Sequence, residues 1–245
     1  MNKHFTIIIP AYNCEKWVES NLNSAALQKY DNYDVVYVDD CSTDNTLKIA
    51  QSIQRQIPNK IKIVSNNVNK KALCNLYEQI SVSKEGTIIV TLDGDDLFPS
   101  SEILTYLNEV YNKLNCWMTV GSYVQNDNYQ VVSPYVPDGY WNQNIRKLPW
   151  SFSHLRTFRR DLFLKINKED LIDDDGHFYR CTFDRAMMYP MVEMCGKEKV
   201  GLINKVMYVY NRHNPLSVDR VDRVNQLRIE SKICNMSPYQ KIQKL

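Results

Sequence analysis

The side chains in this sequence that could most readily do chemistry lie in the acidic run Asp93-Gly94-Asp95-Asp96. Carboxylates this close repel one another, and burying them at a strand end costs free energy unless a cation compensates their charge. Oxygen ligands of this kind suit Mn²⁺ or Mg²⁺, and a metal held by few carboxylates keeps positions open for phosphate oxygens. A solvated acidic turn is the ordinary alternative. Because the run directly follows the apolar stretch 87–92, a metal and diphosphate site is favoured.

The first half of the chain alternates strand and helix patterns. Short β-branched or apolar runs predict strands at 5–9, 35–38, 61–64 and 87–92. Helix-compatible spacing lies between them, at about 14–28, from 42 onward, and at about 70–81. Continuous apolar strands separated by helices indicate a parallel sheet that is covered on both faces. Right-handed crossovers would wind it as an α/β, Rossmann-like, doubly wound and mainly parallel sheet.

Polar residues follow three of these strands. They are Pro10-Ala11-Tyr12-Asn13, Asp39-Asp40 and the acidic run. The carboxyl ends of parallel strands share one edge, where ligands of open α/β sheets bind, so the three clusters should converge on one crevice. Asp40 could accept a hydrogen bond from a pyrimidine ring N–H. The alternative role for Asp40 is a cap on the helix that follows, although Asp44 fits that role better.

The second half of the chain is less regular. A helix is predicted at 100–114 and strands at 117–124 and 206–210, with a loop-rich stretch around Pro134 and Pro137. From residue 218, apolar residues recur every three positions with arginines between them: Val218, Val221, Val224 and Leu227. This pattern predicts an amphipathic helix with a basic face.

Composition excludes several classes of protein. The net charge of +2 argues against a protein that binds nucleic acid by bulk electrostatics. Seven scattered cysteines form no CxxC pair, which argues against zinc and indicates reduced thiols. The start shows no apolar signal region, and no run approaches the length needed to cross a bilayer. We therefore expect a cytoplasmic protein, soluble or peripheral to a membrane.

The three strand-end segments together resemble the family-2 glycosyltransferases. The matching segments are 6–13, 38–46 and 92–96, in the family's order and at its usual separations over the first 100 or so residues. The resemblance implies a GT-A fold and an inverting transfer from a nucleotide-activated sugar, often a UDP-sugar. It also implies donor-side roles for residues of the crevice: Pro10, Tyr12 and Asp40 for the base, Asp95 for the ribose or sugar, Asp93 for the sugar or a position behind the metal ligands, and Asp96, then Asp95, for the metal.

One helix departs from the family pattern. The family often has an Arg-Asn pair in its third helix, and here Asn75 matches while Cys74 stands where arginine is common. Binding of the ribose or sugar would then need another cation in place of the arginine. Lys70 or Lys71 could supply it.

Inversion requires a base that takes the proton of the acceptor hydroxyl as it attacks the anomeric carbon. The segment 178–185 resembles the start of the family's helix that carries this base, so Asp184 is the candidate. The alternative is a surface aspartate paired with Arg185. Three other acidic residues compete, Asp173, Asp174 and Asp175, but the adjacent Gly176 indicates an exposed turn.

Two further segments resemble family positions. The late segment 210–217 resembles the one that folds over the diphosphate, so Arg212 and His213 would contact phosphate or metal. In segment 153–160, His154 and Arg156 would line the acceptor or donor sugar, unless this is a basic helix start on the surface. Trp150 could stack on an acceptor sugar, although core packing is the simpler interpretation.

The main hypothesis is a metal-assisted, inverting glycosyltransferase in one GT-A domain over 1–220. Its nucleotide-sugar half would span 1–115 and its acceptor half 116–220, followed by a C-terminal helical tail at 221–245. The partners would be a nucleotide-sugar and a glycan, lipid-linked or protein acceptor, without nucleic acid. The tail would pack on the domain, form a homodimer or touch a membrane. A nucleotidyltransferase of similar fold and a non-catalytic nucleotide-sugar-binding protein are the alternatives.

Overall fold

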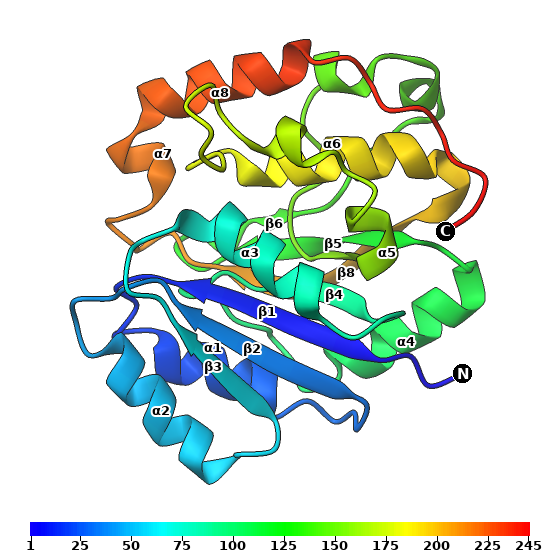
Figure 1. Cartoon of the computed structure of the whole chain (residues 1–245). Helices are drawn as coiled ribbons and strands as arrows, with labels where there is room; N and C mark the ends of the chain where they lie inside the picture. Colours follow the sequence, from blue (N-terminus) through cyan, green and yellow to red (C-terminus); the bar gives the residue numbers. More distant parts are fainter.

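A mixed sheet with helices on both faces forms the centre of the molecule (Figure 1). The structure, a computed structural model, describes the backbone of residues 1–245 and every side chain except those of 218 and 219. The strands are β1 (Phe5–Ala11), β2 (Tyr33–Asp39), β3 (Ile61–Ser65), β4 (Ile88–Thr91), β5 (Met118–Gln125), β6 (Val131–Val132), β7 (Arg156–Arg159) and β8 (Val200–Tyr210). The longer helices are α1 (Val18–Ala26), α2 (Thr46–Gln56), α3 (Lys71–Val82), α4 (Ile103–Leu114), α6 (Phe183–Cys195) and α8 (Arg223–Asn235), and the short ones are α5 (Arg160–Phe163) and α7 (Val218–Val221).

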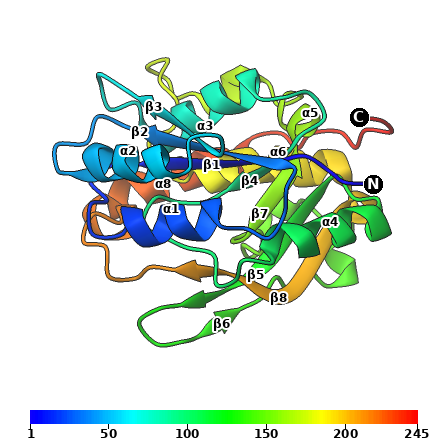
Figure 2. The ribbon, with the colours of Figure 1, turned by 90° about the horizontal axis from the view of Figure 1, so that it is seen from below.

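The strand order is β3-β2-β1-β4-β7-β5-β6, with β8 paired to β5. Strands β1 to β4 are mutually parallel, as the sequence predicts, so the α/β class and the doubly wound half are confirmed. The sequence did not predict β7, which is four residues long and runs antiparallel between β4 and β5. Strand β8 is longer than its predicted core and lies parallel to β5 (Figure 2).

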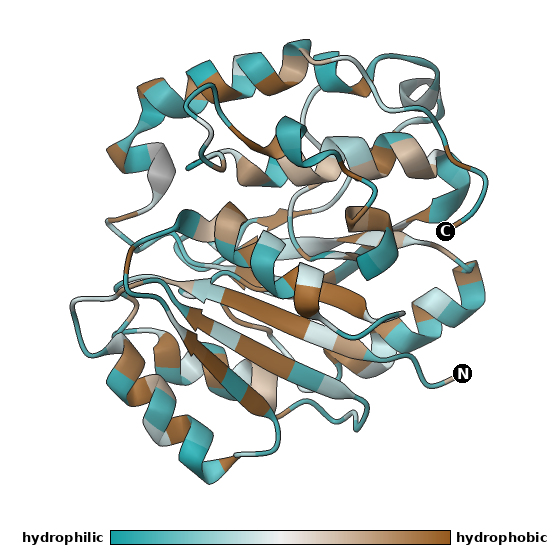
Figure 3. Ribbon diagram, in the orientation of Figure 1, coloured by the Kyte–Doolittle hydropathy of each residue, from teal (hydrophilic) through white to brown (hydrophobic). Residues whose placement is uncertain are grey.

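Two apolar layers hold the helices to the sheet. Every residue of β1 is buried, because its alternate side chains enter opposite layers: Phe5, Ile7 and Ile9 face α1, α2 and α4, while Ile8 faces α3. The hydropathy colouring shows the same contrast between apolar strands and mixed helices (Figure 3). This continuous apolar character is typical of strands covered on both faces.

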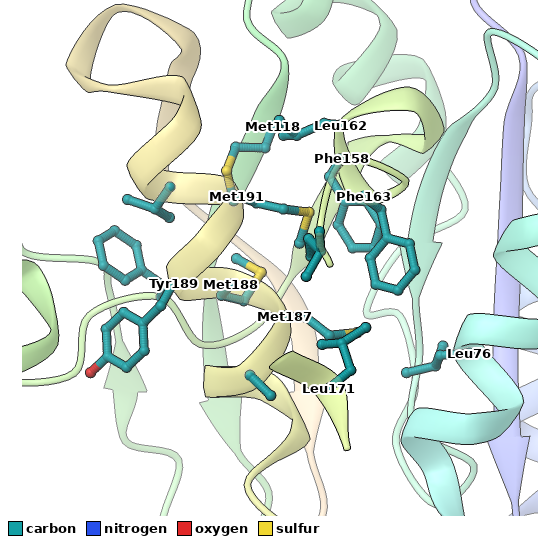
Figure 4. Close-up of a cluster of buried hydrophobic side chains, with 14 of the residues drawn as sticks. Leu76, Met118, Phe158, Leu162, Phe163, Leu171, Met187, Met188, Tyr189 and Met191 are labelled. Atoms are coloured by element: carbon teal, nitrogen blue, oxygen red, sulfur yellow. The ribbon is translucent and has the colours of Figure 1, made fainter. Parts of the chain in front are cut away.

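Helix α6 is buried along most of its length, and three of its methionines, Met187, Met188 and Met191, fill the layer over β5 and β7 (Figure 4). They pack in one cluster with Met118 and Phe158 of the sheet. Unbranched thioether side chains adapt to irregular gaps between a helix and a mixed sheet. The N-terminus of α6, which carries Asp184, is thereby fixed above the sheet.

The end of the chain differs from the predicted helical tail. Helix α8 packs through Ile229 and Ile233, which lie four residues apart on one face. A three-residue repeat drifts around a helix, so the described members of the predicted stripe are exposed: Val221, Val224 and Leu227. The side chain of Val218, the first member, lies outside the described residues. Residues 236–245 are not helical, since Pro238 disfavours helix at the residue before it.

The non-helical end is held against α6 by polar contacts. Arg146 and Glu193 form a buried ion pair at 2.7 Å, and the same carboxylate accepts the backbone N–H of Tyr239. The backbone N–H of Ile242 donates to the carbonyl of Met194 at 3.0 Å. The last residues therefore pack on the domain, as one of the sequence-based alternatives states. No helix among the described residues is long and apolar enough to span a membrane.

Candidate functional site

A cleft of about 420 Å³ opens beyond the carboxyl ends of β1, β2 and β4. Residues from the beginnings of α3 and α6 also line it. This is the crevice where open α/β sheets bind ligands. Ten residues singled out from the sequence line it together: Pro10, Tyr12, Asp40, Asn75, Asp93, Asp95, Asp96, His154, Arg156 and Asp184.

Gly94 lets the acidic run approach the end of β1. A Cβ on Gly94 would lie 2.6 Å from the Cβ of Ala11 and 2.9 Å from its Cα. Side chains do not tolerate such distances, so only glycine fits there. The carboxylates on either side are thus brought beside the segment that carries Tyr12.

Asp40 is buried and accepts three hydrogen bonds. Backbone N–H groups of Lys70 and Lys71 donate to its Oδ1 and Oδ2 at 2.8 Å each, and Asn66 Nδ2 donates to Oδ1 at 2.9 Å. The carboxylate therefore caps the beginning of α3, where unpaired N–H groups favour a negative charge. The alternative cap, on the helix directly after Asp40, is not what forms, because Asp44 accepts the Thr46 N–H there.

The two lysines at the beginning of α3 have different surroundings. Lys70 is bound to both carboxylate oxygens of Glu78 at 2.9 Å. Lys71 lines the cleft, with its ammonium 5.8 Å from the ring centre of Tyr12. Of the two cations that could replace the missing arginine, Lys71 is the one that faces the cleft. Asn75 lies below it, fully buried, and accepts a hydrogen bond from Asn66 at 2.7 Å.

Asp96 is fixed at the floor of the cleft by groups from β8 and the residue after it. The Tyr208 hydroxyl donates to Oδ2, and the backbone N–H of Asn211 donates to Oδ1 at 2.6 Å. Asn21 holds the turn from behind by donating to the carbonyls of Asp93 and Asp96 at 2.9 and 2.7 Å. Each Asp96 oxygen keeps a second lone pair that can ligate a cation.

The three carboxylates are poorly compensated by the protein itself. Burial raises the pKa of Asp95 to about 6, although Asn214 donates to it at 2.6 Å. Burial and the neighbouring carboxylates raise the pKa of Asp96 well above its usual range. Burial also raises the pKa of Asp93, against the opposing effect of Arg156. A bound cation would remove this penalty, so the chemistry of the donor set fits a divalent metal.

His154 joins the acidic run, a position that the sequence did not predict. Its ring stacks on Tyr208 and Tyr210, with centroids 4.3 and 5.2 Å apart. Burial, together with Arg156, lowers the pKa of His154 well below its usual value, which favours the neutral form that ligates metals. One ligand atom from each of Asp93, Asp96 and His154 lies within 4.8 Å of the others, so these three could hold a metal ion.

Arg156 connects the acidic run to the candidate base. Its guanidinium is buried and lies 3.4 Å from Asp93 and 3.9 Å from Asp184. Asp184 stands in the first turn of α6 and lines the cleft. Arg185 instead pairs with Glu230 at 3.0 Å. Asp184 is therefore not the surface aspartate of the alternative interpretation.

The competing carboxylates lie away from the cleft lining. Asp173 accepts hydrogen bonds from the backbone N–H groups of Asp175 and His177, and Gly176 has a φ of 80°. Asp174 pairs with Lys232 at 2.5 Å. The segment is an exposed turn, as predicted.

Three predicted site residues do not line the cleft. Arg212 lies with its guanidinium 5.6 Å from the ring centre of Tyr210, and His213 is exposed. Their segment contributes Asn214, Leu216 and Ser217 to the lining instead. Trp150 packs edge-on to Phe152 and Tyr189, outside the lining of this cleft.

Sequence reasoning missed the groups that fix the carboxylates, namely Tyr208, Asn211 and Asn214. Tyr208 lies in a strand that was predicted, but nothing local in the sequence links it to Asp96, 112 positions earlier. Only the family's late segment, which includes Asn211 and Asn214, indicates that this part of the chain returns to the site.

Comparisons with known proteins agree with this geometry. Residues 6–180 match the family described as "Glycosyl transferase family 2". Glycosyltransferase GlyG of Streptococcus pneumoniae is 25% identical over 226 residues, which cover 87% of this chain and 72% of GlyG. Putative glycosyltransferase EpsE of Bacillus subtilis is 36% identical over 95 residues, covering 38% of this chain. The match spans 34% of EpsE, about a third of that protein's length.

Solved structures show the same fold. TarS 1–349 of Staphylococcus aureus in complex with UDP has a TM-score of 0.67 at 17% identity, covering 94% of this chain and 64% of that one. Glucosyl-3-phosphoglycerate synthase from Mycobacterium tuberculosis has a TM-score of 0.63 at 14% identity, covering 96% and 80%. Since the family match covers more than half of its residues, the chain belongs to glycosyl transferase family 2 and has the GT-A fold.

Proposed function

We propose that the chain transfers a sugar from a nucleoside diphosphate donor, a UDP-sugar, to an acceptor hydroxyl with inversion at the anomeric carbon. The observation that carries the proposal is the arrangement of Asp93, Asp95 and Asp96 beside Asp184 in one cleft, with Arg156 between them. Acidic ligands for a metal and a separate carboxylate for the acceptor proton are the two parts that this reaction needs.

The nucleotide would bind at the β1 and β2 end of the cleft. Tyr12 offers a partly exposed ring for stacking, and Asp40 keeps lone pairs beyond its three hydrogen bonds for a base N–H. Lys71 supplies a cation over the same ring. Related folds bind such donors: TarS has been solved with UDP and UDP-GlcNAc, and a mannosyltransferase from Pyrobaculum calidifontis with GDP-Man and Mn²⁺.

Asp96, with Asp93 and His154 or with Asp95, would hold Mn²⁺ or Mg²⁺. When bound, the ion supplies positive charge that stabilises the leaving diphosphate. Mn²⁺ accompanies UDP in glucosyl-3-phosphoglycerate synthase. Raised carboxylate pKa values support the same assignment, because they mark negative charge that the protein leaves uncompensated.

Transfer would then proceed by a single displacement. The acceptor oxygen forms a bond to the anomeric carbon as the bond from that carbon to the diphosphate oxygen breaks. The hydroxyl proton passes to Asp184, and the electron pair of the broken bond leaves with the nucleoside diphosphate. Arg156, which pairs with both Asp93 and Asp184, would orient the two carboxylates. Arg212 and His213 are neighbours in sequence of Asn214, Leu216 and Ser217, which line the cleft, but do not line it themselves.

The test is to incubate the chain with UDP-, GDP- and dTDP-sugars, in Mn²⁺ or in chelator, and to measure both thermal shift and nucleoside diphosphate release. Metal-dependent stabilisation and slow diphosphate release are expected from one donor class. If no donor produces either effect, the proposal is overturned. A nucleotidyltransferase would instead release pyrophosphate from a nucleoside triphosphate. A non-catalytic binding protein would be stabilised without releasing product.

A further inference from the structure

A second cavity, of about 540 Å³, lies between β5, β6 and the segment that follows them. We call it the aromatic cavity, because Tyr123, Tyr135, Tyr140 and Trp150 are among the residues that line it. Its volume is in the range of cavities that hold small ligands. It shares no lining residue with the cleft described above.

The aromatic cavity stands at a definite place along the sheet edge. Across the strand order, Asp40 follows β2, Tyr12 follows β1, the acidic run follows β4, and His154 precedes β7. The next strands, β5 and β6, line the aromatic cavity. A donor with its base over β1 and β2 and its diphosphate over β4 would present its sugar toward the β7 and β5 side. An acceptor must approach from that side.

Two side chains that line the aromatic cavity contact residues near the cleft. The ring of Tyr123 packs edge-on to His154, with centroids 5.5 Å apart, and Ser153 precedes His154 in the chain. At another wall, Trp150 lies under the guanidinium of Arg185 at 4.9 Å. Arg185 follows Asp184 directly. The aromatic cavity is therefore next to His154 of the metal cluster, and Trp150 of its lining contacts the first turn of α6, which also carries Asp184.

The lining of the aromatic cavity selects for an uncharged ligand. None of its 15 described lining residues is Asp, Glu, Lys, Arg or His. Aromatic and proline rings supply flat apolar surfaces, and Ser133, Ser151 and Gln143 add hydroxyl and amide groups. Apolar surfaces with a few orienting hydrogen-bonding groups suit a neutral sugar ring, which has apolar C–H faces and a hydroxyl rim. None of the described lining residues would supply a cation to a phosphate there.

We propose that the aromatic cavity binds a neutral sugar ring of the acceptor. This inference rests on the proposed glycosyl transfer and narrows its acceptor to a class. A neutral acceptor would distinguish this chain from two proteins of similar fold. TarS is named as a poly(ribitol-phosphate) transferase, and glucosyl-3-phosphoglycerate synthase has been solved with phosphoglyceric acid.

Two substitutions can perturb the aromatic cavity with little risk to the fold. Gly139 is an exposed residue of the lining and a Cβ there meets no atom within 4 Å, so Gly139→Phe places a ring at the edge of the cavity without a clash at Cβ. Tyr135 is 77% exposed at the rim, so Tyr135→Ala removes a ring and leaves the core intact. Tyr129, 81% exposed on the β5–β6 turn and outside the cavity lining, gives the matched control Tyr129→Ala.

Binding is measured first without donor, by saturation-transfer NMR with the methyl glycosides of glucose, galactose and N-acetylglucosamine, and with glucose 6-phosphate. Wild type and Tyr129→Ala should give signals with at least one neutral glycoside and none with the phosphate. Gly139→Phe should lose the signal. Absence of binding by every neutral glycoside, preference for the phosphate, or unchanged binding in Gly139→Phe would each overturn the inference.

Kinetics with the same neutral glycoside as acceptor then separate this inference from the proposed function. Gly139→Phe and Tyr135→Ala should raise the acceptor KM roughly tenfold, about the loss of one aromatic contact. Donor KM and acceptor-independent donor hydrolysis should match wild type. If hydrolysis and transfer are absent in wild type but the glycosides bind the cavity, the proposed function fails and the binding site remains. If transfer occurs and neither variant changes acceptor KM, the binding site fails alone.

Discussion

The ends of β2 and β4 both present aspartates to one sheet edge, yet their surroundings are opposite. Asp40 after β2 receives three N–H donors, two of them from the beginning of α3. Asp96 after β4 has two donors and two carboxylate neighbours, and its pKa is raised well above the usual range. The protein's own N–H donors thus compensate the charge of Asp40, whereas the charge of Asp96 needs a cation. A carboxylate's role follows from its donors and neighbouring charges.

Asp96→Asn should lower the transfer rate more than any other substitution proposed here. A smaller loss would contradict the contrast between Asp40 and Asp96. The amide keeps the size of the side chain and an acceptor for Asn211 but removes the charge. We expect transfer to fall about a thousandfold, since a metal contributes several kcal/mol to transition-state stabilisation. Mn²⁺ should no longer raise the melting temperature. A variant that keeps a tenth of the wild-type rate would contradict the metal assignment.

Asp184→Asn tests the base without disturbing the acidic run. Loss of a general base should lower the transfer rate by about a hundredfold or more, while Mn²⁺ still stabilises the protein. Asp174→Asn is the matched control, because Asp174 pairs with Lys232 on an exposed turn away from the cleft lining. Near wild-type transfer by Asp184→Asn would remove Asp184 from the mechanism.

Asp40→Ala tests the contrast between Asp40 and Asp96 through the free energy of unfolding. It leaves the N–H groups of Lys70 and Lys71 without their acceptor, which should cost about 1–3 kcal/mol of unfolding free energy in urea titrations. Donor KM should rise about tenfold if Asp40 also contacts the base. In chelator, Asp96→Asn should by contrast be as stable as wild type or more so, because it removes a poorly compensated buried charge. Equal losses in the two variants would contradict the comparison.

The smallest expected effect is a pH dependence of stability in chelator. The folded pKa of Asp95 is about 6, above an unfolded value of about 3.9, so the folded state holds this proton more tightly. The resulting stabilisation is complete below about pH 4 and is lost as pH rises through 6. Between pH 5 and 7 the melting temperature should fall by about 3 °C from this group. Asp95→Asn should flatten that slope, and an unchanged slope would contradict the assignment.

Much of the cleft at the ends of β1, β2 and β4 could be predicted because its groups follow their own strands directly. Tyr12, Asp40 and the acidic run are contiguous with apolar segments whose parallel pairing was predictable from their pattern. The aromatic cavity was less predictable. It is formed by β5, β6 and an irregular stretch rich in proline, where no hydrophobic period indicates how the chain folds. The C-terminal helix was predicted, but its packing face was not.

By itself, the sequence determined which residues reach the sheet edge, because strand period and parallel pairing are local consequences of apolar pattern and helical crossovers. It also placed glycine where the turn after β4 meets the end of β1. Only the tertiary structure decided how those residues are used. The antiparallel insertion of β7 brings His154 and Arg156 beside the acidic run, and β8 carries Tyr208 to Asp96. These pairings join residues some 60 to 112 positions apart. Their register depends on the packing of the whole sheet, so it cannot be predicted from any single segment of the sequence.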